Sequence, residues 1–413
     1  MKALASLLFF LTTAASATPW HNLGPRAMGM GGAHVAIAQG PSAAYWNPAG
    51  LGQLFDSSGV EILAGIRVEA TGGVLLGAND LNQLAKDCSK TPQVCTTERV
   101  NKALDRMDHL GNGASFDGAL AVGARVGSGM LFVHSLTYVG GTPEVDHAVN
   151  SGDLALNNSK LILRGGNFTH IGYGMGRELG KSGIVIGANL KLIVGSVGYR
   201  QMIIVNEDPG PGSIWRYDKN SKTSLAPGID VGAFWDMRET FPSLPARPRL
   251  GIVGRNVNAP TFEQPDAATS AGDRTRFPLN GQVRAGLAIQ PYDFVTMAAD
   301  IDLTNNTTSI DRFQSRFLSL GMELRLHNKG FFLPLRLGLQ KNVANADSAL
   351  AFTTGTSFEF SQFKFEVALQ LSPTVTAIQS ERVTKRLPNN LAGSIRLAWE
   401  FGQVDPGNAA LPY

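Results

Sequence analysis

Segments in which apolar and polar residues alternate recur from about Gly59 to Phe401, and this period-two pattern constrains the fold more than any other feature. Alternation of this kind is typical of strands whose two faces meet different environments. The last segment separates into two clean sets, with Ile395, Leu397, Trp399 and Phe401 on one face and Ser394, Arg396, Ala398 and Glu400 on the other. The pattern predicts an all-β protein.

The connections between these segments indicate which β fold the chain adopts. Fourteen strand candidates begin near residues 59, 115, 129, 161, 183, 223, 248, 281, 293, 315, 331, 348, 363 and 391, and short connections alternate with long ones. This alternation is typical of bacterial outer-membrane barrels, in which an even strand number returns both chain ends to the periplasm. We therefore predict a transmembrane antiparallel β-barrel of about 14 strands over residues 55–402. The alternative is a soluble sandwich or a lipocalin-like barrel.

Composition narrows the function classes. Only 17% of the 413 residues are charged, the net charge is +3, and no run of Lys or Arg marks a phosphate-binding surface, so no nucleic-acid partner is predicted. After the first 17 residues no stretch of about 18 apolar residues follows, which excludes a helical membrane anchor. A membrane protein with this sequence would have to be a barrel.

The N-terminal region divides into two parts. Residues 1–17 carry Lys2, an apolar run and Ala15-Ser16-Ala17, the order of a cleavable secretory signal, so we predict export to the Gram-negative outer membrane. Residues 18–54 are rich in glycine and proline and too broken for a strand. We interpret them as an N-terminal plug inside the barrel lumen. At the other end, residues 403–413 form a predicted periplasmic tail.

The plug region carries a family resemblance. Residues 26–33 (RAMGMGGA) followed by residues 43–51 (AAYWNPAGL) resemble the N-terminal hatch of the long-chain fatty acid transporter, or FadL, superfamily of outer-membrane proteins. This resemblance implies passive uptake of small hydrophobic solutes through a plugged barrel. It leaves open whether the plug is a movable hatch or a fixed stopper. The motif residues are Arg26, Gly29, Gly31, Gly32, Asn47, Pro48, Gly50 and Leu51.

A second resemblance covers most of the chain. The stretch VGRNVNAPTF at residues 253–262, VRAGLA at 283–288 and AADIDLT at 298–304 resemble the TraF-like outer-membrane proteins associated with plasmid transfer. This resemblance implies an alternative function, a non-transporting structural or interaction protein associated with conjugation or secretion machinery. The implied partners are outer-membrane lipid together with a hydrophobic small molecule or with proteins of that machinery.

Charged residues of both signs fall on the face that we assign to the lumen. A charge facing lipid would cost about 2–4 kcal/mol at mid-bilayer, so this face must be the interior. Two interpretations remain open, a paired network that packs around the plug and a track that guides a substrate. The candidate lumen charges are Arg67, Arg125, Arg284, Asp300, Asp302, Glu323, Arg325, Arg336, Glu366, Arg396 and Glu400.

The first long connection, residues 71–113, contains the clearest helical pattern. We predict a helical external loop with helices from about Asn79 and from Thr97, joined near a disulfide between Cys88 and Cys95. The loop is interpreted either as a cap over the barrel mouth or as a solvated loop without that role.

No catalytic motif is present. The sequence lacks a nucleophile elbow, a phosphate-binding glycine loop and a His-Glu-x-x-His zinc motif, and its seven histidines are scattered. His34 is interpreted as a packing residue within the plug. We therefore predict no enzyme activity, no cofactor and no metal site.

Overall fold

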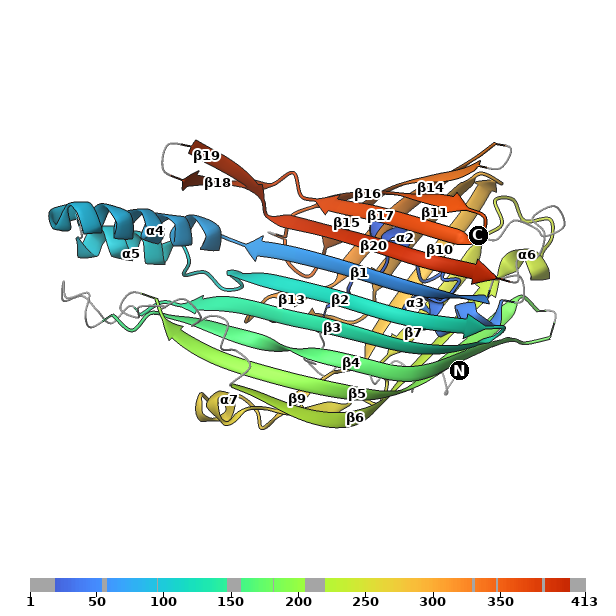
Figure 1. Cartoon of the computed structure of the whole chain (residues 1–413), viewed down its shortest axis with the longest axis horizontal. Coiled ribbons are helices and arrows are strands. Elements are labelled where there is room, and N and C mark those ends of the chain that lie inside the picture. Colours follow the sequence, from blue (N-terminus) through green and yellow to red (C-terminus); the bar gives the residue numbers. More distant parts are fainter. Residues whose placement is uncertain are drawn as a thin grey trace.

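The computed structural model describes residues 19–53, 58–94, 96–146, 157–180, 182–204, 220–328, 331–346, 348–380 and 383–401. Fourteen strands form one closed barrel with consecutive neighbours paired around the ring (Figure 1). Every pair is antiparallel, and the ring closes where β1 (Ser58–Thr71) pairs with β20 (Asn390–Phe401) over twelve residues in register.

The barrel strands between β1 and β20 are β2 (Gly113–Val126), β3 (Gly129–Glu144), β4 (Lys160–Glu178), β5 (Ile184–Ile203), β6 (Ser221–Asp236), β7 (Arg249–Arg255), β10 (Gln282–Tyr292), β11 (Val295–Asp302), β14 (Phe317–Asn328), β15 (Phe331–Asn342), β16 (Ala351–Phe360) and β17 (Phe363–Leu371). Each of the fourteen begins within three residues of its predicted start. The predicted antiparallel barrel is confirmed, and the sandwich alternative is wrong because the ring closes on itself.

Side-chain burial follows the period-two pattern. In β1, Ile62 and Ile66 are 55% and 57% exposed on the outside, whereas Glu61 and Arg67 are buried on the inside. Leu63, an apolar residue at an inward position of β1, is also buried on the inside. The apolar faces of the strands thus point outward and the polar faces point inward, as in a barrel that meets hydrocarbon from outside.

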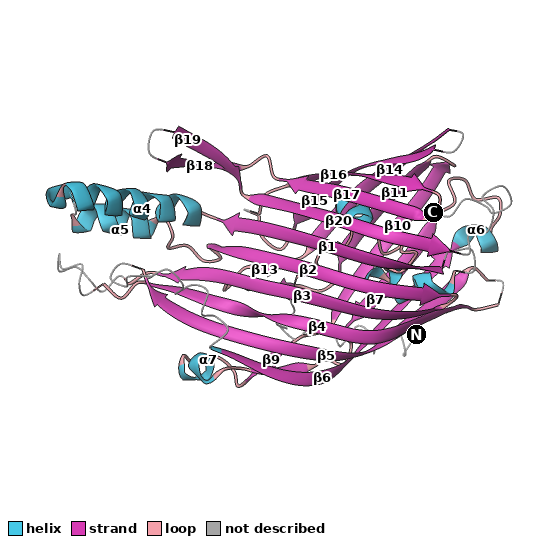
Figure 2. Cartoon of the chain, viewed as in Figure 1, coloured by secondary structure: helices cyan, strands magenta, loops and turns pink. Residues whose placement is uncertain are grey.

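The two ends of the barrel differ (Figure 2). The end that we call the turn end carries short connections such as residues 127–128, 293–294 and 361–362, and a longer one with α6 (Met237–Thr240). The opposite end, which we call the loop end, carries the long connections. These contain small elements that the sequence did not predict, β8 (Thr261–Glu263), α7 (Asp266–Ser270), β9 (Arg276–Pro278), β12 (Asn306–Thr307), β13 (Gln314–Ser315), β18 (Val375–Ser380) and β19 (Val383–Pro388).

The helical loop forms at the predicted place but does not lie over the barrel mouth. Helices α4 (Val74–Lys90) and α5 (Thr97–Asp105), joined by η3 (Pro92–Val94), project along the barrel axis away from the strands (Figure 1). Their apolar side chains, among them Leu84 and Leu104, pack against each other and against Val145 and Ile204, which follow β3 and β5 at the loop end. The interpretation of this hairpin as a cap is therefore wrong.

Several predicted features lie outside the described residues. These are the signal segment 1–17, the tail 403–413 and Cys95; Cys88 itself is disulfide-bonded. Among the helices that the structure describes, none is both long enough and apolar enough to cross a membrane.

Candidate functional site

The chain before β1 occupies the interior of the barrel. Residues 19–53, which we call the inner segment, are buried almost throughout and contact strands on several sides of the ring. The segment folds into α2 (Pro25–Gly29), α3 (Ala43–Trp46) and η2 (Pro48–Gly52), with tight turns between them. Trp20 and Trp46 stack with ring centroids 6.1 Å apart and are fully buried. The segment therefore has a small apolar core of its own.

Glycines bring the backbone of the inner segment directly against the backbone of the wall. A Cβ at Gly338 of β15 would lie 2.2 Å from the Gly31 amide nitrogen, and one at Gly176 of β4 would lie 2.3 Å from the Gly52 nitrogen. Gly31 also has φ of +67°, which favours glycine. No side chain fits at these contacts, which explains why a glycine stands on both sides of each contact.

Asn47 connects the segment to itself and to the wall. Its amide Nδ2 donates to the carbonyl of Val35 at 3.1 Å and to that of Ala233 in β6 at 3.2 Å. Its Oδ1 accepts the N–H of Ala49 at 3.1 Å and so caps η2, which begins with Pro48. The donor and the acceptor of this fully buried amide therefore both have partners. Asn47 stabilises the fold of the inner segment and also its attachment to the wall.

Two carboxylates of β11 face the inner segment and the loop that follows β11. Asp300 accepts the backbone N–H groups of His34 at 2.7 Å and Val35 at 2.8 Å. Asp302 pairs with Arg284 of β10 at 2.5 Å and accepts the N–H of Phe317 at 2.8 Å. The Arg284 guanidinium also lies 4.6 Å from the ring centroid of Trp20 in the segment.

Arg26 joins the inner segment to a chain of ion pairs on the wall. Its guanidinium donates two hydrogen bonds of 3.0 Å to Glu323 of β14. Glu323 also accepts from Arg336 of β15 at 2.7 Å, and Arg336 in turn pairs with Glu366 of β17 at 2.9 Å. Bidentate pairs of this kind fix direction as well as charge.

The chain of ion pairs continues around the ring to β1. Arg396 of β20 pairs with Glu366 at 2.8 Å and with Glu61 of β1 at 2.6 Å. Glu400 lies 3.5 Å from Arg396 and 2.8 Å from Lys364, and Lys364 also lies 3.4 Å from Glu359 of β16. The structure thus brings together five of the predicted lumen charges, Glu323, Arg336, Glu366, Arg396 and Glu400.

The remaining predicted lumen charges lie elsewhere in the interior. Arg125 of β2 is buried and donates to the carbonyls of Leu51 and Gln53, at 3.1 and 3.2 Å, near the end of the inner segment. Arg325 donates to Thr296 at 3.2 Å. Arg67 pairs with Asp117 at 2.5 Å near the loop end.

Sequence reasoning missed several contacts of the inner segment because they are made by neutral side chains. Thr353 donates to the Gly29 carbonyl at 2.9 Å and accepts the Gly31 N–H at 3.0 Å. Asn189 donates to the Ala44 carbonyl at 2.6 Å. Neutral polar residues on an inward face are common in barrels, so only the contact with the segment distinguishes these two.

The connection from β11 to β14, residues 303–316, crosses the lumen at the loop end. A Cβ at Gly113 of β2 would lie 2.6 Å from the Ile310 side chain, and one at Gly140 of β3 would lie 2.5 Å from Ser309. Strands β2 and β3 lie opposite β11 and β14 in the ring of fourteen. We call this connection the crossing loop, because it reaches across the full width of the barrel.

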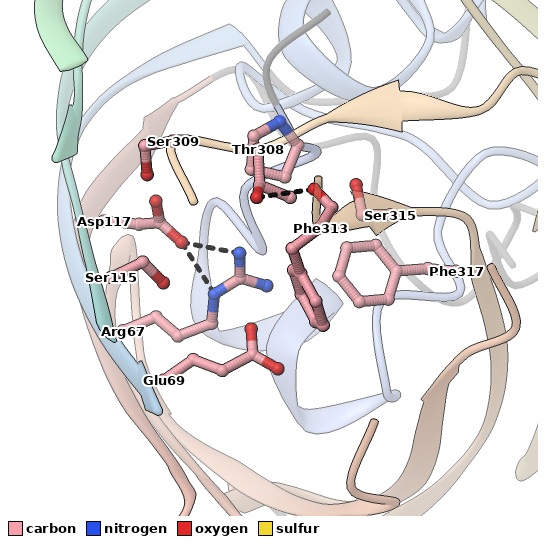
Figure 3. A pocket seen from close by; sticks show the side chains of 10 residues that line it. Arg67, Glu69, Ser115, Asp117, Thr308, Ser309, Phe313, Ser315 and Phe317 are labelled. Atoms are coloured by element: carbon pink, nitrogen blue, oxygen red, sulfur yellow. Dashed lines mark hydrogen bonds and ion pairs between the residues drawn. The ribbon is translucent and has the colours of Figure 1, made fainter. Parts of the chain in front are cut away.

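The crossing loop and the inner segment almost meet. Between them lies a cavity of about 10 Å³, lined by Arg67, Asp117 and residues from both, including Pro19 and Phe313 (Figure 3). A cavity of this size is about one probe sphere, enough for a single water at most. Among the described residues, the crossing loop and the inner segment therefore approach each other closely at this point.

Burial changes the titration of a histidine in the inner segment. The His21 side chain lies against the Tyr138 ring, with centroids 4.3 Å apart, and its Nε2 is 3.3 Å from the Thr137 carbonyl. Burial, which disfavours the charged imidazolium, lowers the pKa of His21 from its ordinary 6.5 to about 4. His34 is likewise fully enclosed, with its ring 5.6 Å from that of Trp46.

The described residues contain no cluster of three or more His, Cys, Asp or Glu side chains arranged to hold a metal ion. What the site consists of is a segment held inside a closed ring by backbone contacts, neutral hydrogen bonds and ion pairs. A segment held in this way can obstruct the lumen, and displacement of the segment can open the lumen.

Comparisons with known proteins give one family match and several solved structures of similar fold. The family described as "F plasmid transfer operon, TraF, protein" matches residues 44–302. The solved structure of the Ralstonia pickettii toluene transporter TbuX is similar in fold, with a TM-score of 0.51 at 14% identity, over 92% of this chain and 98% of that one. A Pseudomonas aeruginosa FadL homologue gives a TM-score of 0.49 at 12% identity, over 94% and 100% of the two chains. No curated protein sequence matches the chain.

Proposed function

This chain belongs to the family described as F plasmid transfer operon, TraF, protein, and from that premise we propose that it is an outer-membrane β-barrel for passive uptake of small hydrophobic solutes. The inner segment acts as its plug, and displacement of the plug opens the lumen. The loop end faces the outside of the cell and the turn end faces the periplasm, as in other bacterial barrels.

One observation carries this proposal: the ring of fourteen strands is complete without the inner segment. β1 pairs directly with β20, and the segment contributes no strand to the barrel. Its displacement therefore breaks side-chain and backbone contacts in the lumen but no ladder hydrogen bond of the wall. A stopper that can leave while the wall stays intact suits a transporter.

The solute class is supported by the fold and by the outer surface. TbuX, described as a toluene transporter, shares the fold of this chain. The outer face of the barrel wall is strongly apolar, so a hydrophobic solute that is released at this face enters an apolar environment.

The test compares the intact mature chain with a variant that lacks residues 18–54, both reconstituted in liposomes. Uptake of a labelled fatty acid and of toluene is measured together with single-channel conductance. We expect the intact protein to take up one of the two solutes and Asn47→Ala to change the uptake rate, since this change removes the bonds to Val35, Ala233 and Ala49. Protein-free liposomes set the background for both solutes.

A second candidate function is favoured by how completely the lumen is filled. The ion pairs from Arg26 to Lys364 and the water-sized cavity beside the crossing loop are compatible with a fixed stopper as well as with a movable hatch. In this case the protein is a non-transporting structural or interaction protein associated with conjugation or secretion machinery. If neither form moves either solute and deletion of the segment only creates an ion-conducting pore, the uptake proposal is wrong and this second function takes its place.

A further inference from the structure

The cavity between the crossing loop and the inner segment lies beside the predicted start of the exported chain. Pro19, the first residue that the structure describes, is buried and lines this cavity. The sequence predicts that export removes residues 1–17. Hydrolysis of the bond between Ala17 and Thr18 leaves a free α-amino group on Thr18, and an α-amine with its ordinary pKa of about 7.7–8.0 is mostly protonated at neutral pH. The exported chain therefore begins with a positive charge next to the cavity.

Covalent geometry limits how far this charge can lie from the cavity. Three bonds separate the α-nitrogen of Thr18 from the nitrogen of Pro19, so the two atoms lie within about 4 Å of each other. The cavity has a volume of about 10 Å³, so its opposite walls are about one water molecule apart. The α-nitrogen can therefore reach the cavity without any displacement of Pro19.

The cavity walls carry two negative charges and one positive charge. Arg67 and Glu69 of β1 and Asp117 of β2 line the cavity, and all three side chains are buried (Figure 3). Arg67 contacts only Oδ2 of Asp117, from Nε at 2.8 Å and from Nη2 at 2.5 Å, so Oδ1 is left for another donor. Because Arg67 is paired with Asp117, Glu69 keeps no cation of its own among the described side chains. A buried charge without a counter-charge is costly, so the cavity favours a cation.

A buried hydroxyl indicates independently that a group is missing from this cavity. Ser315 of the crossing loop lines the cavity and is 1% exposed, and its Oγ has no hydrogen-bond partner in the described part of the chain. Most buried side-chain polar atoms in proteins do have a partner. An ammonium group donates three hydrogen bonds, and Ser315, Glu69 and Asp117 offer it an oxygen each. The small volume suits this compact group and excludes a hydrocarbon solute.

We propose that the α-ammonium of Thr18 binds in this cavity, between the carboxylates of Glu69 and Asp117, and anchors the start of the inner segment to the wall. The proposal rests on the predicted removal of residues 1–17 but not on solute uptake. Before that removal the same nitrogen is a neutral amide with a single hydrogen to donate, and the preceding residues have to leave the barrel past the same place. The inner segment is therefore locked in position only in the processed chain.

The other groups around the cavity do not supply this cation. His21 interacts with both Arg67 and Asp117, but burial lowers its pKa to about 4, so it is neutral at pH 7. Tyr138 of β3, whose ring lies against that of His21, carries a phenol and therefore forms no cation. The lining residues contributed by the crossing loop are uncharged, namely Thr308, Ser309, Phe313 and Ser315.

The test is trace acetylation of the folded, purified mature protein with acetic anhydride over a range of pH. The protein is then denatured and digested with trypsin, and mass spectrometry measures acetylation of the N-terminal peptide, which ends at Arg26 and also shows where the mature chain begins. Glu69→Gln removes the surplus charge and keeps the size of the side chain. Insertion of two glycines between Ala17 and Thr18 moves the α-amine away from the cavity and leaves the wall unaltered. Glu239→Gln is the matched control, because Glu239 is exposed in α6 at the turn end.

We expect the α-amine of the unaltered protein to be acetylated about tenfold more slowly at pH 8 than that of the glycine-insertion variant, since the ammonium form does not react. The pKa read from the pH profile should fall by about one unit in Glu69→Gln and stay unchanged in Glu239→Gln. A mature chain that begins elsewhere than at Thr18 would overturn the proposal, as would equally fast acetylation in the unaltered and insertion proteins. An unchanged pKa in Glu69→Gln would also overturn it, because a water or an inorganic cation would then be the occupant. Failure of solute uptake in liposomes leaves these results unaffected, so the two proposals fail separately.

Discussion

Replacing Asp300 with alanine tests whether the inner segment is held by the wall. The change removes the acceptor for the N–H groups of His34 and Val35, both of which lie in the buried part of the segment. Each buried N–H left unpaired costs about 1–3 kcal/mol, and loss of the carboxylate offsets part of this by ending its own burial. We expect the docked state to lose about 2–4 kcal/mol relative to the released state.

The assay uses a feature of the sequence. Arg26 is the single Lys or Arg within residues 19–53, and its bond to Ala27 is enclosed while the segment is docked. Trypsin cleavage after Arg26 therefore reports the released population when opening and closing are fast relative to cleavage. A loss of about 2–4 kcal/mol corresponds to a cleavage rate about 30- to 700-fold higher, since each 1.4 kcal/mol is about tenfold.

Two variants control this experiment. Asp300→Asn keeps one oxygen as an acceptor and should raise the rate less than alanine does. Asp273→Asn alters a carboxylate of the loop between β7 and β10 whose hydrogen bonds go to Arg164 of β4, at 3.0 and 3.1 Å, so it should leave the rate nearly unchanged. A rate for Asp300→Ala within twofold of the unaltered protein, with the barrel intact by its gel mobility, would refute the reasoning.

The remaining predictions concern pH and close packing. Because the pKa of His21 falls from 6.5 to about 4 on burial, the contribution of His21 to docking is fully present above pH 6.5 and is lost as the pH falls toward 4, by up to about 1.4 kcal/mol per unit. A red shift of tryptophan emission in this window measures the release, and a pH response unchanged by His21→Gln would contradict the assignment. Gly338→Ala places a Cβ 2.2 Å from the Gly31 nitrogen, so we expect faster cleavage after Arg26 with unchanged gel mobility of the barrel. Cleavage as slow as in the unaltered protein would show that the wall gives way at this contact.

The sequence determined the barrel because the signals for it are local. Alternation within each strand separates an inward face from an outward face, and the lengths of the connections separate the two ends. Each barrel strand accordingly begins within three residues of its expected place, down to the last strand, which ends at Phe401. The inward direction of Glu323 and Arg396 follows from the same pattern, because it needs only the neighbours of each residue in the chain.

The tertiary structure alone decided what fills the barrel. The partners of Arg26 and Asp300 are 297 and 266 residues away along the chain, and alternation carries no information about which strands meet across a ring. The crossing loop was missed for the same reason, and the sequence could not decide whether the helical hairpin is a cap or a solvated loop. A helical pattern shows that a segment is amphipathic but not what its apolar face covers. Glycines such as Gly31 and Gly338 could be noted in the sequence, yet only closure of the ring brings their backbones into contact.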